Sequence, residues 1–210
     1  MTNLRETTFF IFGCLIAAMV LLSSCHNSSN STPPVLPIDS VRNGDIVFRR
    51  GRSFSSDIIL SHDSDNRYSH IGIVYKNDRG CQVIHAVNEE PDFEGDFDRV
   101  KIESIEKFFS PERASAGAMY HSWLGDTLQD IIIGKAMEYV SDSVRFDSDF
   151  NHYDSKELYC TELIYTIYNY IGIDITEGRR TKVGVICFPS EIIFPSDIEK
   201  NKKLTKYFDY

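Results

Sequence analysis

A predicted β-hairpin near the middle of the chain restricts the possible folds more than any other segment. The runs Ile71–Tyr75 and Cys81–Val87 are rich in apolar and β-branched residues, which favours strands. The segment Asn77–Gly80 separates them and supplies the Asn, Asp and Gly residues that tight turns require. Strands joined by so short a turn pair as antiparallel neighbours, so the chain must build a sheet around this pair.

Helices are predicted around this sheet. The segments 126–141 and 160–171 carry apolar residues at helical spacing, and Gly172 is expected to end the second helix. Weaker signals predict strands at 46–48, 100–102, 117–123 and 183–188, short helices at 55–60 and 104–109, a basic loop at 49–52, and a turn or short helix at 189–191. This order predicts an α+β domain in which a curled antiparallel sheet packs against helices.

The first residues predict an export signal followed by lipidation. Arg5 precedes an uncharged run, Thr8–Leu22, which is shorter than the ~20 residues of a membrane span. The segment Leu22–Cys25 resembles the bacterial lipobox, in which small residues expose the backbone to a peptidase and the cysteine takes a lipid. We therefore predict a signal peptide over 1–24 and acyl chains on Cys25. A plain secretory signal and an uncleaved anchor are the alternatives.

A tether and one domain are predicted to follow. Residues 25–35 are rich in Ser, Asn and Pro, which is typical of a flexible linker, and residues 36–210 are long enough to bury one core. The formal net charge of −9 argues against nucleic-acid binding, which favours a basic face. The acidic run at 92–98 is interpreted as a solvated loop, with a calcium loop as the alternative.

The cysteines leave a free thiol in the domain. Cys14 lies in the predicted signal and Cys25 is the predicted lipidation site, so Cys81, Cys160 and Cys187 remain. An odd number in an exported protein leaves at least one of them unpaired. Cys81 and Cys187 stand in apolar, strand-like runs, where simple buried thiols are favoured over a disulfide between the two.

Cys160 opens the second predicted helix and is the candidate nucleophile. A sulfur in the first helical turn lies near unpaired backbone N–H groups and the positive end of the helix dipole, which both stabilise the thiolate. A nearby imidazolium would lower the thiol pKa further from its usual ~8.5. The N–H of Cys160 could also stabilise an oxyanion on an attacked carbonyl. The alternative is a small buried hydrophobic residue on an amphipathic helix.

His70 and His85 are the candidate partners of this thiol. His70 stands at the start of the first hairpin strand, and His85 lies in the second. In the hairpin, positions whose numbers sum to roughly 155 to 157 face each other, so both imidazoles are expected close together on one face. The second histidine could then bond the far nitrogen of the first and fix its tautomer. A structural role in the core is the alternative for each.

Four segments in this order resemble the permuted papain-like enzymes of the YaeF/YiiX type, a branch of the NlpC-type superfamily. They are Gly44–Phe48, Ser69–Val74, Ile84–Ala86 and Tyr159–Ile164. Ordinary papain-like enzymes place the cysteine before the histidine, whereas here the histidine comes first. This is the permuted arrangement, and it can build the same site because catalytic geometry does not depend on chain order.

The resemblance implies a circularly permuted papain-like or NlpC-type fold and a cysteine hydrolase. It implies Cys160 as nucleophile, His70 as base and His85 in the third position, where relatives carry a glutamate, a histidine or a similar group. Glu162 is expected to project around the helix, away from His70. The implied reaction is attack on an amide or ester carbonyl, a thioacyl intermediate and release by water, without a cofactor or metal.

Together with the export signal, these implications predict a membrane-anchored lipoprotein of the bacterial cell envelope, on the periplasmic or surface side. Its expected partner is a small amide or peptide substrate that contains an amino acid. Arg49, Arg50 and Arg52 could hold a substrate carboxylate or simply be solvated. The oligomeric state stays open.

Three other functions compete with this one. Some permuted relatives move acyl chains between lipids and acceptors, although the chain lacks the Asn-Cys-x-His-Phe box typical of that branch. The domain could instead be an inactive substrate-binding module. A zinc site built from His70, His85 and Cys160 is the third alternative, without the short ligand spacing that would support it.

Overall fold

The computed structural model describes residues 32–151, 156–184 and 189–210, which belong to one compact unit, Thr32–Tyr210. The predicted signal peptide, Cys25 and Cys187 lie outside the described residues, as does the tether up to residue 31. Among the residues that the structure does describe, no helix is long and apolar enough to cross a membrane.

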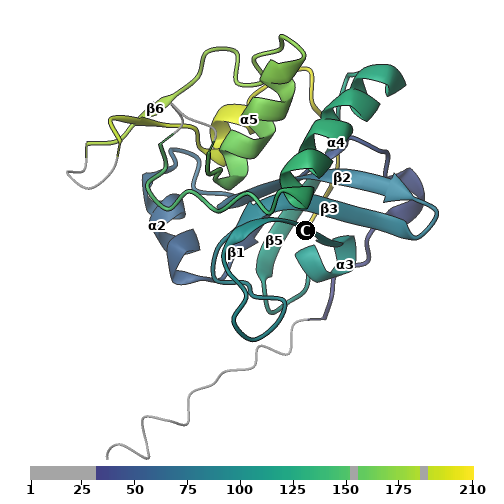
Figure 1. The fold of residues 1–210 in the computed structure, drawn as a ribbon, viewed down its shortest axis with the longest axis horizontal. Coiled ribbons are helices and arrows are strands. Elements are labelled where there is room, and N and C mark those ends of the chain that lie inside the picture. Colours follow the sequence, from purple (N-terminus) through teal and green to yellow (C-terminus); the bar gives the residue numbers. More distant parts are fainter. Residues whose placement is uncertain (1–31, 152–155, 185–188) are drawn as a thin grey trace, which may run out of the picture. The chain divides into compact units, whose positions relative to one another are not determined.

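The main sheet has six antiparallel strands in the order β4-β3-β2-β1-β5-β8, and its edges are not joined (Figure 1). The strands are β1 (Ile46–Gly51), β2 (His70–Asn77), β3 (Gly80–Val87), β4 (Arg99–Ser104), β5 (Ala114–His121) and β8 (Thr205–Asp209). A second, two-stranded sheet consists of β6 (Thr181–Lys182) and β7 (Glu191–Ile192). The prediction of an α+β domain with an antiparallel sheet is confirmed.

The helices are α2 (Phe54–His62), α3 (Ile105–Phe108), α4 (Asp126–Ser141), α5 (Cys160–Tyr170) and α6 (Pro195–Glu199), with a 3-10 turn, η1, at Ile38–Ser40. The bounds of α4 are those predicted, and α5 starts at the predicted Cys160. Ser104 caps α3, because its hydroxyl accepts the backbone N–H of Lys107. Gly172 follows α5 with a φ of 75°, a conformation that favours glycine.

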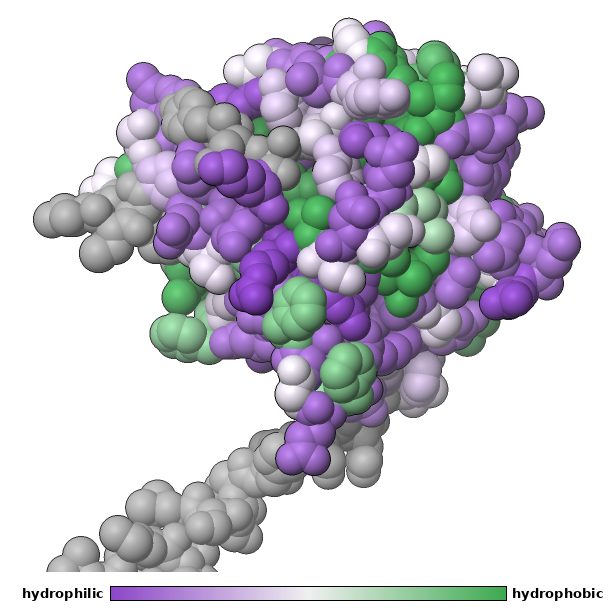
Figure 2. All heavy atoms as spheres, viewed as in Figure 1, coloured by the Kyte–Doolittle hydropathy of each residue, from purple (hydrophilic) through white to green (hydrophobic). Residues whose placement is uncertain are grey.

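Two cores cover the two faces of the sheet. Alternate residues of β1 to β3 face α4 and α5, which lie side by side over the sheet in Figure 1. The intervening residues of the same strands pack with Phe108 and Phe109 at the end of α3. Hydrophilic residues cover most of the outer face over α4 and α5, with hydrophobic residues scattered among them (Figure 2). The apolar faces of the helices are therefore used against the sheet.

The hairpin register decides how the two histidines face each other. Ile73 pairs with Ile84, and continuing this register puts Gly72 opposite His85. His70 and His85 are consequently diagonal neighbours on one face rather than directly opposed. Gly72 makes room for side chains of the second strand, because a Cβ there would lie 2.4 Å from Cγ1 of Val83 and 3.3 Å from Cβ of His85.

Several predicted boundaries were wrong. The basic loop at 49–52 is largely strand, since β1 continues to Gly51, and β5 begins at Ala114 and ends at His121. The lysine-rich tail contains β8, which pairs with β5 at the edge of the sheet. Of the strand predicted at 183–188, positions 183 and 184 are not in a strand and the rest lie outside the described residues. The turn predicted at 189–191 leads into β7. In β1, β5 and β8, pairing with a neighbouring strand outweighs local propensity.

Candidate active site

One cleft brings Cys160 and His70 together as lining residues, at the end of the sheet where β2 begins. Polar lining residues come from β1, the start of α2 and the loop after β3; they are Arg49, Ser53, Ser55, Ser56, Asn88 and Glu90. Apolar lining residues come from α2, the segment before α5 and the segment after β7; they are Ile59, Phe146, Phe150, Ile192, Ile193 and Phe194. The cleft therefore offers polar and apolar surface around one thiol and one imidazole.

The first turn of α5 is pinned to the segment after β7. The hydroxyl of Thr161 donates to the carbonyl of Ile193 over 2.6 Å, and the hydroxyl of Tyr159 accepts the N–H of the same residue over 3.3 Å. Glu162 is buried and accepts the backbone N–H of Tyr159, so its carboxylate caps the helix. These bonds hold Cys160, the first residue of the helix, at the edge of the cleft.

The sulfur of Cys160 is buried among backbone donors. It accepts the backbone N–H of Ile71, the residue after His70, and the N–H of Thr161. Burial outweighs these bonds and raises the pKa of the Cys160 thiol to about 11. Burial and the nearby charge of Arg49 hold the pKa of His70 well below its usual range. The expectation of a lowered thiol pKa was wrong, since both groups are neutral before substrate enters.

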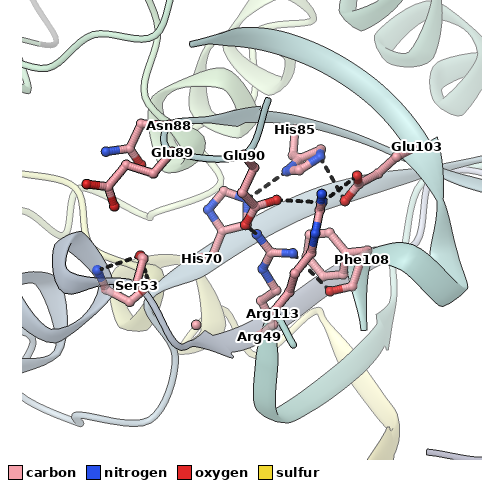
Figure 3. A network of polar contacts seen from close by, with 12 residues as sticks. Arg49, Ser53, His70, His85, Asn88, Glu89, Glu90, Glu103, Phe108 and Arg113 are labelled. Atoms are coloured by element: carbon pink, nitrogen blue, oxygen red, sulfur yellow. Dashed lines mark hydrogen bonds and ion pairs between the residues drawn. The ribbon is translucent and has the colours of Figure 1, made fainter. Parts of the chain in front are cut away.

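A line of three side chains runs away from the cleft across β2, β3 and β4 (Figure 3). Nε2 of His70 lies 2.8 Å from Nδ1 of His85, and Nε2 of His85 lies 3.3 Å from Oε1 of Glu103. All three are buried, and both imidazole rings pack on Phe108 with centroids 5.7 and 5.4 Å away. The predicted contact between His70 and His85 is thus present, and Nδ1 of His70 is the ring nitrogen left for the cleft.

Glu103 was not predicted from the sequence. Its β4 neighbour Lys101 pairs with His85, so Glu103, two residues on, is a diagonal neighbour of His85 on the same face. The signal that could have found it is the strand alternation of Lys101 and Glu103. Nη1 of Arg113 lies 2.6 Å from Oε2 of Glu103, and Nζ of Lys107 lies 3.5 Å away. The pKa of Glu103 falls to about 2: His85 and Arg113 lower it, against the opposing effect of burial.

Arg49 lies in the wall of the cleft. It stands directly across from His70 in the β1–β2 pair, and its guanidinium pairs with Glu90 and donates to the carbonyl of Phe108 over 2.9 Å. Its carbon Cζ lies 4.6 Å from the centre of the Phe108 ring. Since its side chain is 2% exposed, Arg49 is not the solvated residue that one of the two interpretations expected.

The other candidate residues lie elsewhere. Asp92, in the acidic run, pairs with Lys101 and Lys107, which agrees with a loop whose carboxylates are neutralised by lysines. Cys81 is buried in the core on the α3 side, and its predicted lack of a disulfide with Cys187 stays a prediction.

Comparison with known proteins decides the family. The sequence profile described as "permuted papain-like amidase enzyme, YaeF/YiiX, C92 family" matches residues 40–190. The chain belongs to this family. A C92-family amidase is a cysteine hydrolase of the papain-like type, which agrees with a thiol and an imidazole on one cleft.

A solved structure supports the same fold. This C92-family chain is similar to the crystal structure of the metalloprotein YiiX from Escherichia coli O157:H7, with a TM-score of 0.65 and 18% identity. The similarity covers 80% of this chain and 97% of the YiiX chain. No curated protein matched the sequence.

The description of YiiX as a metalloprotein raises the question of a metal in this family member. The facing nitrogens of His70 and His85 lie at hydrogen-bond distance from each other, so they cannot both bind one ion in this arrangement. Within residues 32–151, 156–184 and 189–210, no three His, Cys, Asp or Glu side chains are grouped to hold a metal. The described residues do not fit a metal site, and the mechanism below uses none.

Proposed function

We propose that this chain is a lipid-anchored amidase of the bacterial cell envelope. It cleaves the amide bond of an amino-acid- or peptide-containing substrate through a thioacyl intermediate on Cys160. The observation that carries the proposal is the 2.8 Å contact between His70 and His85 behind a cleft that Cys160 also lines. Such a contact leaves one nitrogen of His70 free to act as a base toward the cleft.

The neutral state of both groups dictates the order of proton transfers. Sγ of Cys160 attacks the carbonyl carbon as its proton passes to Nδ1 of His70, and the N–H of Cys160 is a donor for the oxyanion. The imidazolium then gives the proton to the leaving nitrogen, and the C–N bond breaks. Water, deprotonated by His70, attacks the thioester; the C–S bond breaks, the acid leaves, and His70 returns the proton to Sγ of Cys160.

The mixed lining of the cleft favours a substrate with both polar and apolar parts. Serine hydroxyls from the start of α2, together with Asn88 and Glu90, supply hydrogen-bonding groups for an amino acid or a peptide. Ile192, Ile193 and Phe194 supply apolar surface for the other part of the substrate. This apolar surface also favours a second candidate function, hydrolysis or transfer of an acyl chain from a lipid.

The envelope location rests on the Leu22–Cys25 motif and the preceding uncharged run. Expression of the full chain with radiolabelled palmitate tests the anchor, and we expect label that disappears in Cys25→Ala. Label retained by Cys25→Ala would contradict lipidation at this residue.

The activity is tested by offering purified protein peptides, N-acyl amino acids and acyl lipids side by side. We expect amine release from an amide substrate, together with an acyl adduct on Cys160 that mass spectrometry detects after acid quenching. Adducts formed only from acyl lipids would support the second candidate. A chain that forms no adduct and releases no amine from any of these substrates would be a binding module, and the proposal would be wrong.

A further inference from the structure

Glu103 stands at the closed end of the line formed by His70 and His85, away from the cleft (Figure 3). We infer that Glu103 is a positioning residue that sets the tautomers of both histidines and thereby keeps Nδ1 of His70 unprotonated for the thiol. The inference rests on the proposed function, because it concerns the base of that reaction. It adds a residue from β4 to a site that the sequence placed on β2, β3 and α5.

The argument starts from the carboxylate, which can only accept hydrogen bonds when it is ionised. Arg113 and Lys107 approach Oε2 of Glu103 at 2.6 and 3.5 Å, and Oε1 faces His85. His85 and the nearby charges of Arg113 and Arg49 lower the pKa of Glu103 and keep its carboxylate ionised, so Glu103 does not donate a proton toward the histidines. One oxygen is thus held by cations while the other is aimed at the imidazole.

Because Glu103 can only accept a hydrogen bond, it determines which ring nitrogens of His85 and His70 carry protons. Nε2 of His85 and Oε1 of Glu103 are buried 3.3 Å apart, and neither atom forms a hydrogen bond of normal geometry with another described residue. A proton on Nε2 makes the contact between these two atoms attractive, because the carboxylate oxygen can only accept. Burial lowers the pKa of His85, which is therefore neutral and has a lone pair on Nδ1. Nδ1 then accepts from Nε2–H of His70 over 2.8 Å, and the lone pair of His70 falls on Nδ1.

The reverse order of protons would disable the base. If the group behind His85 could donate, Nδ1 of His85 could carry the proton and give it to Nε2 of His70. His70 would then carry its own proton on Nδ1 and could not accept one from Cys160. A carboxylate excludes this arrangement, whereas an amide in the same place permits both.

The test reads the tautomers directly and does not depend on knowing the substrate. Long-range ¹H–¹⁵N correlation spectra of protein labelled with ¹⁵N-histidine separate the two neutral tautomers, and His70→Gln and His85→Gln assign the signals. We expect both histidines of the wild type to be protonated on Nε2. In Glu103→Gln, we expect a substantial population of His70 protonated on Nδ1, because the amide can donate. In Glu103→Asp, the wild-type pattern should largely return.

Glu90→Gln is the matched control. Glu90 also pairs with Arg113 at 2.6 Å, but among the described residues it acts on His85 through its charge and not through a hydrogen bond, so its replacement should leave both tautomers unchanged. Thermal unfolding checks that each variant is folded. Wild-type tautomers in a folded Glu103→Gln, or a wild-type His85 protonated on Nδ1, would overturn the inference.

Kinetics on any substrate found for the wild type separate this inference from the proposed function. We expect kcat of Glu103→Gln to fall about 10²-fold with little change in KM, since the wrong tautomer disables the base without touching the cleft. If the wild type shows the predicted tautomers but does not hydrolyse any amide, the proposed function would be wrong and the positioning role of Glu103 would stand. Wild-type turnover with unchanged kcat in Glu103→Gln would sink the positioning role alone.

Discussion

Among the residues that the structure describes, two buried carboxylates each contact a histidine, in different parts of the sheet. Glu103 of β4 lies beside His85, and Asp45, just before β1, lies 3.0 Å from Nδ1 of His121 at the end of β5. His121 stacks on Tyr207 of β8, with ring centroids 3.9 Å apart, and the Tyr207 hydroxyl donates to Asp45 over 2.9 Å. In the Glu103–His85 pair, the histidine contacts His70, which lines the cleft. The Asp45–His121 pair instead connects β1, β5 and β8.

The surroundings of the two carboxylates differ in charge. His85 and Arg113 lower the pKa of Glu103 to about 2 despite its burial. Burial raises the pKa of Asp45 despite its bonds from Arg42, His121 and Tyr207. The comparison teaches that a histidine–carboxylate contact does not by itself mark a catalytic site. What distinguishes the first pair is a second imidazole that reaches a cleft lined by a thiol.

The largest expected effect comes from the nucleophile Cys160. It lines the cleft that the Glu103–His85–His70 line reaches, whereas the Asp45–His121 pair has no such partner in our mechanism. Cys160→Ala should lower amide turnover by about 10⁴-fold or more, since the acyl group then has no acceptor. Cys81→Ala, which removes a buried thiol of the α3 side, should retain turnover and lose about 1 kcal/mol of stability. Amine release under identical conditions measures the difference, and equal activity of the two variants would remove Cys160 from the mechanism.

The next effect compares the two histidine regions directly. His70→Gln should lower kcat by about 10³-fold, because the base is lost, and should lower the free energy of unfolding by about 1–2 kcal/mol, because its buried bond to His85 is disturbed. His121→Gln should leave kcat within about twofold and lower the free energy of unfolding by about 1–2 kcal/mol, because its bond to Asp45 is disturbed. Steady-state kinetics and urea unfolding of both variants check the contrast. If His121→Gln were the inactive one, the two regions would have been assigned the wrong way round.

The pH dependence of stability should have opposite signs at the two carboxylates. The folded-state pKa of Glu103 is about 2, below its ordinary 4.5, so its ionised form stabilises the fold above pH 4.5 and this is lost as pH falls from 4.5 to 2. The expected loss is roughly 3 kcal/mol and should be missing in Glu103→Gln. The pKa of Asp45 is raised, so its contribution is full at low pH and is lost as pH rises above 3.8.

Urea unfolding of the wild type, Glu103→Gln and Asp45→Asn from pH 2 to pH 7 measures these contributions. Relative to the wild type, stability should become less pH-dependent in Glu103→Gln below pH 4.5, and the Asp45→Asn difference should have the reverse slope. Two differences of the same sign would show that the charges around the two carboxylates do not act as described.

The smallest expected effect is the change in thiol reactivity of Cys160 for each unit of pH. Because the pKa of Cys160 is about 11, the thiolate fraction and the rate of alkylation by iodoacetamide should rise about tenfold per pH unit between pH 7 and pH 10. Peptide mass spectrometry separates Cys160 from the buried Cys81, which should react only after unfolding. A fast rate that is flat from pH 6 upward would instead indicate a preformed thiolate–imidazolium pair.

Much of the local structure follows from short stretches of sequence. The Asn77–Gly80 turn and the two apolar runs beside it suffice for the hairpin, and helical spacing suffices for α4 with its correct ends. Cys160, His70 and His85 could be identified as candidate catalytic residues from the sequence, because a thiol at the start of a helix and histidines on paired strands are local patterns. The YaeF/YiiX resemblance of these segments is confirmed by the family match.

Other features depend on partners far away in the chain, which no local pattern reveals. Arg49 and the residues of β8 lie in strands because neighbouring strands supply their hydrogen bonds, against the polar character of both segments. Glu103 meets His85 only through the β3–β4 register, and burial sets the pKa of Cys160 in the direction opposite to the helix dipole. The helices, the strands of the hairpin and the candidate nucleophile could be inferred from residues adjacent in the sequence. Which groups of the site are charged, and which nitrogens carry protons, depends instead on residues that are adjacent only in the folded structure.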